Sequence, residues 1–126
     1  MTIKKTNNLK LNFLGVYTNR FDESFVFYTE VIGLGVKHSK PGWTAFATGQ
    51  LKFELFETDK SLTRIKASQE PVFIGFETQN IEASLKRIKS KNIDIVEELA
   101  SHSWGMDYYI NDPDGNLIQI AQYKRT

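Results

Sequence analysis

Cysteine is absent from this chain of 126 residues, so thiol nucleophiles, disulfides and cysteine-ligated metals are excluded. A dominant charge is also lacking, because 16 Lys and Arg residues stand against 15 Asp and Glu residues. This balance provides no basic field for nucleic acid and no acidic field for a cationic drug. We therefore expect no nucleic-acid partner.

Long apolar runs are missing as well. No run approaches the roughly 20 residues that a helix needs to cross a bilayer, and residues 1–12 lack the apolar core of a signal peptide. These features predict a cytoplasmic protein with no membrane partner. The length fits one domain.

The sequence contains one pattern twice, about sixty residues apart. Residues 13–18 align with residues 73–78, and residues 52–57 align with residues 117–122. We expect a single domain over residues 1–126, with module one at about 9–58, a linker at about 59–70 and module two at about 71–123. Neither copy can bury its apolar face alone, so the two must pack together.

Each copy has the order βαβββ. Apolar periodicity predicts helices at 22–32 and 81–90, with Gly33 as a helix stop and Asn80 as an N-cap. Asp112 and Gly115 have the chemistry of a tight turn before the last strand. Alternation predicts strands at residues 9–18, 35–38, 43–48, 51–58, 72–78, 93–99, 106–111 and 116–123. The fold class is α+β, with a curved mixed sheet and an open cleft.

Three short motifs carry a family resemblance: Phe27-Tyr28 in the first helix, Ile32-Gly33-Leu34 after it, and Asp112-Pro113-Asp114-Gly115-Asn116 before the last strand. With the element order, they make residues 9–123 similar to the vicinal oxygen chelate superfamily. This superfamily includes glyoxalase I, extradiol dioxygenases and bleomycin-resistance proteins. The resemblance implies a glyoxalase-like fold and leaves the reaction open, because one scaffold hosts many chemistries.

Metal enzymes of this superfamily take ligands from the first and last strands of each copy. The resemblance places Phe13 and Phe73 at the first pair of positions, and Glu54 and Gln119 at the second pair. Phenyl rings cannot ligate, and one carboxylate with one amide falls short of a divalent site. We therefore expect no metal and no cofactor.

The two histidines do not supply the missing ligands. His38 lies at the end of a short expected strand, and His102 lies in an expected loop before Trp104. Nothing in the sequence brings them together.

Strand alternation sends the four ligand-position side chains into the cleft. Tyr109 matches a tyrosine that faces the site in fosfomycin-resistance enzymes, so Asp107 shares its side. Trp43 and Trp104 either stack on a ligand or close the ends of the sheet. The candidate ligand-binding residues are Phe13, Trp43, Glu54, Phe73, Trp104, Tyr109 and Gln119.

Two classes of function remain open. One is a metal-free homodimer that binds a small organic molecule, similar to the bleomycin-resistance branch. The other is a lyase, isomerase or dioxygenase that uses Glu54 as its catalytic residue with a weakly held divalent metal. Glu54 is either a desolvated general base or a strand glutamate paired with a lysine. A structural dimer without a ligand is the third alternative.

Overall fold

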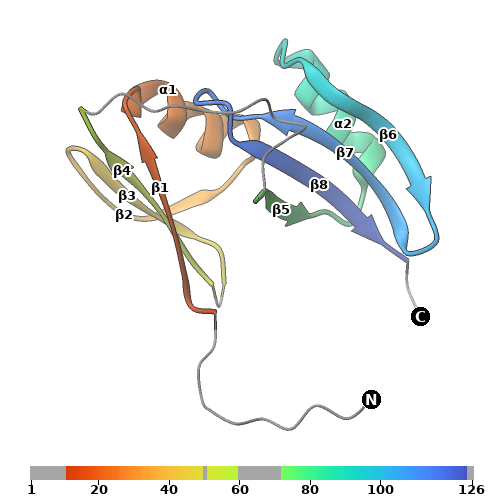
Figure 1. Ribbon diagram of the computed structural model, residues 1–126, viewed down its shortest axis with the longest axis horizontal. Helices are drawn as coiled ribbons and strands as arrows, with labels where there is room; N and C mark the ends of the chain where they lie inside the picture. Colours follow the sequence, from red (N-terminus) through yellow and green to blue (C-terminus); the bar gives the residue numbers. More distant parts are fainter. Residues whose placement is uncertain (1–10, 50, 60–71, 125–126) are drawn as a thin grey trace, which may run out of the picture.

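Two four-stranded sheets of identical topology form the protein (Figure 1). The computed structural model describes residues 11–49, 51–59 and 72–124, so the expected linker lies outside the described residues apart from Asp59. The N-terminal sheet has the order β1 (Phe13–Thr18), β4 (Lys52–Glu57), β3 (Trp43–Ala47) and β2 (Gly35–Lys40). The C-terminal sheet has the order β5 (Ile74–Glu77), β8 (Leu117–Tyr123), β7 (Gly105–Asn111) and β6 (Ile95–His102).

The strand pairing repeats in register. β1 is parallel to β4 with Gly15 opposite Glu54, and β5 is parallel to β8 with Gly75 opposite Gln119. The remaining pairs within each sheet are antiparallel. The alignment of the two halves is therefore correct at the level of single residues, and the α+β class is confirmed.

The first helix changes its hydrogen bonding midway. α1 (Phe21–Val26) continues as a π-helical turn, η1 (Phe27–Val31), which ends with a bond from the Ile32 amide to the Phe27 carbonyl. Gly33 follows with a φ of +93°, as expected for a helix stop. The first, second and fifth residues of η1 are buried in the core.

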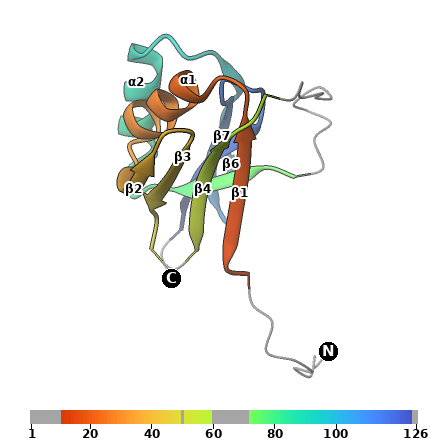
Figure 2. The same ribbon diagram turned by 90° about the vertical axis from the view of Figure 1, so that its left-hand side faces the viewer.

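The second helix, α2 (Ile81–Ser90), has the expected boundaries. Asn80 caps it, since its side chain accepts a bond of 3.1 Å from the Ala83 amide. Arg87 donates to the carbonyls of Glu30 and Val31 and so contacts the end of η1. η1 and α2 are therefore in contact, and Figure 2 shows α1 and α2 on the same side of the strands.

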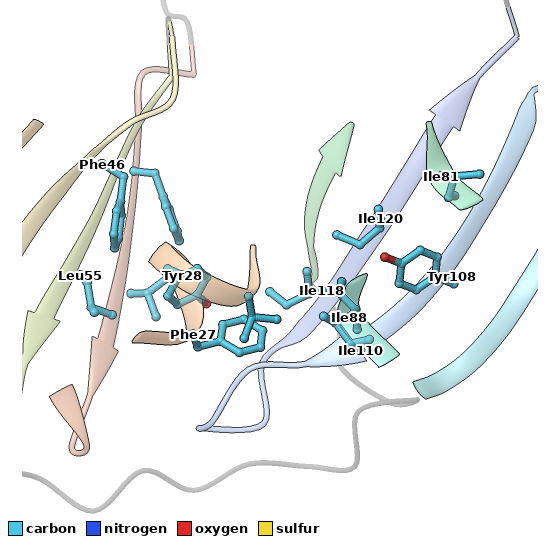
Figure 3. Close-up of a cluster of buried hydrophobic side chains, with 13 residues drawn as sticks. Phe27, Tyr28, Phe46, Leu55, Ile81, Ile88, Tyr108, Ile110, Ile118 and Ile120 are labelled. Carbon is cyan, nitrogen blue, oxygen red and sulfur yellow. The ribbon is translucent and has the colours of Figure 1, made fainter. Parts of the chain in front are cut away.

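One core joins both sheets. Figure 3 shows Phe46 and Leu55 of the N-terminal sheet on one side and Ile118 and Ile120 of the C-terminal sheet on the other, with Tyr28 between them. Each is buried, and burial of such a side chain contributes about 1.5–3 kcal/mol. We call these sides of the sheets their inner faces. The opposite sides, the outer faces, both point away from this shared core.

The strand β6 is the main departure from the expected elements. It extends to His102, whereas alternation predicts a strand that stops at Leu99. Its register against β7 shifts between Ile95 and Glu97 and again between Glu97 and Ala100. Such bulges break the two-residue period, so the sequence pattern hides the end of the strand. Neither described helix is long and apolar enough to cross a membrane.

Candidate functional site

The outer face of the N-terminal sheet is aromatic with a polar centre. We call it the N-terminal face; strand register assigns to it Phe13, Gly15, Tyr17, His38, Trp43, Ala45, Lys52, Glu54 and Phe56. Phe13 is 43 % exposed, and its ring lies 6.2 Å from that of Phe56. Glu54 stands in a row between Gly15 and Ala45, and the rings of Phe13 and Phe56 lie over the space that Gly15 leaves open.

Glu54 is held by a tryptophan. The indole Nε1–H of Trp43 donates a hydrogen bond of 2.7 Å to Oε1 of Glu54, which is half-buried. Among the described residues Glu54 forms no ion pair, so no pairing with a lysine of the same chain is observed there. Trp43 therefore orients the carboxylate of Glu54 on this face.

The outer face of the C-terminal sheet holds a chain of hydrogen bonds. The Nε2 of Gln119 donates to Oδ2 of Asp107 at 2.9 Å and to the hydroxyl of Tyr109 at 3.3 Å. The other oxygen of Asp107, Oδ1, lies 2.7 Å from Nε2 of His102. Asp107 is only 5 % exposed, and these polar partners compensate its burial.

Aromatic rings flank this network. The ring of Phe73 packs edge-on against Tyr109 at 5.7 Å, and Trp104 stacks on His102 at 5.0 Å with an angle of 10° between the planes. The C-terminal face consists of Phe73, Gly75, Glu77, His102, Trp104, Asp107, Tyr109, Gln119, Ala121 and Tyr123. It is the counterpart of the N-terminal face in the second module.

The phenol of Tyr109 remains a hydrogen-bond donor at neutral pH. Burial raises the pKa of Tyr109 above 10.0, and the charge of Asp107 beside it and a hydrogen bond with that carboxylate raise the pKa further. Gln119 acts in the opposite direction with its hydrogen bond. The face thus offers a neutral hydroxyl next to a buried carboxylate.

The expected site residues fall into two groups. Phe13, Trp43 and Glu54 lie on the N-terminal face, whereas Phe73, Trp104, Tyr109 and Gln119 lie on the C-terminal face. Within the described part of the chain, every ring contact and hydrogen bond of these side chains stays within one face. The single cleft expected from the sequence therefore stays a prediction, and the structure places the candidate residues on two outer faces.

The contact between His102 and Asp107 is a feature of the C-terminal face that the sequence pattern missed. His102 is expected in a loop, yet it ends β6 and faces the outer side beside Asp107. Alternation along β7 already predicted that Asp107 lies on the same side as Tyr109. The sequence therefore placed Asp107 correctly but not His102. The two histidines remain on different sheets, His38 on β2 and His102 on β6.

The fold and both faces define a protein of the glyoxalase type. Residues 10–120 match the family model of the Glyoxalase/Bleomycin resistance protein/Dioxygenase superfamily, so the chain belongs to this superfamily.

Solved structures share the fold. A glyoxalase/dioxygenase from Nostoc punctiforme superimposes with a TM-score of 0.80 at 16% identity, over 98% of this chain and 100% of that chain. TnmS3, an antibiotic binding protein from Streptomyces sp. CB03234, gives a TM-score of 0.72 at 20% identity, over 95% and 100%. Lactoylglutathione lyase from Agrobacterium tumefaciens gives 0.68 at 20% identity, over 93% and 96%. At these identities the likeness establishes the fold alone.

The residues at the superfamily's metal positions do not fit a divalent ion. Phe13 and Phe73 have no donor atom, while Glu54 and Gln119 lie on faces that do not converge within one chain. Oε1 of Glu54 accepts from an indole and Nε2 of Gln119 donates to Asp107, so these two residues leave one carboxylate oxygen and one amide oxygen as donors, one on each face. In residues 11–49, 51–59 and 72–124, no three His, Asp or Glu side chains are grouped to hold a metal.

Proposed function

We propose that the protein binds a small organic molecule without a resident metal, in a site that two chains form together as a homodimer. The observation that carries this proposal is the pair of outer faces, each aromatic, each with a central polar group and each open on its own. Phe13 and Phe73 are 43 % and 48 % exposed, and exposed apolar clusters mark binding surfaces.

The chemistry of the faces suits a planar ligand. Aromatic rings stack on planar molecules, while Glu54, Tyr109 and Gln119 provide one carboxylate, one hydroxyl and one amide for hydrogen bonds. TnmS3, whose fold is similar, is described as an antibiotic binding protein. Small-molecule binding is therefore a role described for another protein with this fold.

A second chain supplies what one chain lacks. In a twofold dimer, the N-terminal face of one chain can cover the C-terminal face of its partner, and the symmetry generates two equivalent sites. Each site would then contain Phe13 and Glu54 from one protomer with Phe73, Tyr109 and Gln119 from the other. This arrangement would also cover the exposed rings.

The alternative is a lyase, isomerase or dioxygenase in which Glu54 acts with a divalent metal. That function requires further donors beside Glu54, and the outer faces offer phenyl rings at the corresponding positions. The binding function makes no such demand, so we favour it.

Mixed dimers test the proposal. Thermal-shift screening of aromatic compounds first provides a ligand, and light scattering should give twice the mass of one chain. Glu54→Arg and Gln119→Arg should each abolish ligand binding, because a large cation fills the site. After unfolding and refolding together in equal amounts, the two variants should regain about a quarter of the binding sites, since about half of the dimers are mixed and each mixed dimer has one intact site of two.

The alternatives give different results. If one chain carried the complete site, mixing the two inactive variants would restore nothing. Monomers in light scattering would also contradict the proposal. Lys91→Arg, at the end of α2 and outside both faces, is the control and should bind as the unmodified protein does.

A further inference from the structure

A hollow of about 400 Å³ lies on the N-terminal face between β2 and β4. Its floor is low because Ala45 and Ala47 of β3 have small side chains. Taller side chains rise on both sides, from β2 and from β4. The volume falls in the range of small-molecule pockets, about 300–1,000 Å³. The hollow is lined by Lys37, His38, Trp43, Ala45, Phe46, Ala47, Thr48, Gly49, Lys52, Phe53 and Glu54.

Its rim carries two cations without a partner. Lys37 and Lys52 are exposed, and within the described part of the chain neither ammonium group forms an ion pair. Glu54 is the one carboxylate among the lining residues. Two ammonium groups beside one carboxylate give the hollow a net positive charge. This charge attracts an anionic ligand.

Glu54 favours a hydrogen-bond donor of the ligand rather than an anion. Trp43 occupies Oε1 of Glu54, while Oε2 accepts no hydrogen bond from the described residues. A carboxylate oxygen in this position pairs with an O–H or N–H of a ligand. Lys52 and Glu54 are two residues apart on β4, so they project from the same face, with their Cα atoms about 6.6 Å apart. A substituted benzene ring spans such a distance.

We propose that this hollow binds an aromatic carboxylate that carries a hydrogen-bond donor at the opposite end of its ring. The ligand carboxylate lies between the ammonium groups of Lys37 and Lys52, and the donor reaches Oε2 of Glu54. The ring lies over Ala45 beside the indole of Trp43. This inference names a ligand class for the N-terminal half of the proposed two-chain site. It rests on the proposed function only because both use the N-terminal face.

The probe is 4-hydroxybenzoate, compared with benzoate and with neutral 4-hydroxybenzamide. The indole N–H signals of the two tryptophans are followed by NMR, and Trp104→Phe identifies the signal of Trp43 by elimination. We expect 4-hydroxybenzoate to move the Trp43 signal at lower concentration than either comparison compound. Equal binding of the amide would overturn the inference, because the amide lacks the charge that the lysines recognise.

Substitutions test which protein residues contact each end of the ligand. Lys37→Met together with Lys52→Met should weaken binding of 4-hydroxybenzoate about five- to tenfold, as expected for two partly exposed ion pairs. Added salt should weaken it in the same direction. Lys91→Met, a lysine at the end of α2, is the matched control. Glu54→Gln should reduce the preference for 4-hydroxybenzoate over benzoate and leave benzoate binding at least as strong.

The result separates this inference from the composite site. If the lysine substitutions weaken binding but the mixed dimers restore nothing, the ligand class proposed for the hollow is supported and the two-chain site is contradicted. If mixed dimers restore binding of another aromatic compound while the lysine substitutions leave the affinity for 4-hydroxybenzoate unchanged, the proposed ligand class is wrong. No shift of the Trp43 signal with any of the three probes would also overturn it.

Discussion

The hydroxyl of Tyr28 donates a hydrogen bond of 2.6 Å to Oδ2 of Asp112, 84 residues further along the chain. Both side chains are buried. Oδ1 of the same carboxylate accepts from the backbone amides of Asp114 and Asn116 and so holds the last turn. The bond joins the helix of module one to the turn of module two, and thus connects two of the motifs by which the family resemblance is identified.

Tyr28→Phe should lower the free energy of unfolding by about 1–3 kcal/mol, because a buried carboxylate loses one of its donors. Burial already raises the pKa of Asp112, and the bonds from Tyr28 and Asn116 counteract that rise. Urea denaturation measures the loss. Tyr17→Phe, on a residue that is 59 % exposed, is the control and should stay within about 0.5 kcal/mol. Equal effects of the two substitutions would contradict the role of the bond.

Tyr109 should make stability depend on alkaline pH. Its folded pKa lies above the unfolded value of 10.0, so its protonated form is favoured in the native state. This stabilisation is complete below pH 10 and is lost as the pH rises through the folded pKa. Between about pH 8 and about pH 11, the unfolding free energy of the unmodified protein should therefore fall more steeply than that of Tyr109→Phe. Parallel curves would show that the phenol titrates normally.

Chelation should leave the melting temperature unchanged. The ligand positions carry Phe13 and Phe73, so no metal-binding free energy is coupled to folding. Protein purified without chelator is melted with and without excess EDTA. A metal held at a hundred times its dissociation constant would add about 2.7 kcal/mol, and its removal would lower the melting temperature visibly. Such a decrease would reverse our interpretation of the metal positions.

Gly75→Ala should disturb the C-terminal face. A Cβ at this position would lie 3.0 Å from Oε1 of Gln119, so the amide must shift and its bond to Asp107 weakens. The side-chain NH₂ signals of Gln119 should move in NMR spectra, with weaker ligand binding. Gly35→Ala is the matched control, because its Cβ would meet only the Cβ of Ala47 at an ordinary 3.8 Å. Unchanged Gln119 signals in Gly75→Ala would contradict the prediction.

Local chemistry made much of the fold predictable from the sequence. The repeat gave the register of Glu54 and Gln119, and the cap at Asn80 and the turn at Asp112 follow from side-chain hydrogen bonding. In the first and last strands of each copy, alternation also assigned the residues to the faces on which strand pairing places them. It could not give the angle between two sheets, because that angle depends on core packing by residues such as Tyr28. The separation of Phe13 from Phe73 was therefore invisible in the sequence.

Two further structural features could not be predicted from the sequence pattern. The π-helical turn at Phe27–Val31 keeps a helical spacing of apolar residues, so periodicity alone reads it as a continuous α-helix. The bulges of β6 move His102 onto the outer face, where it meets Asp107. Both features arise from backbone hydrogen bonding that tertiary contacts select.

The edge strand β2 has a consequence for how such a protein can diversify. All six of its residues are exposed, and it supplies Lys37 and His38 to the hollow on the N-terminal face. Substitutions on this strand remove almost no core packing, so they cost little stability. β4 differs, because it carries Glu54 on one side and the buried Phe53 and Leu55 on the other. New ligand preferences can thus accumulate along β2 by single neutral steps while β4 preserves the scaffold.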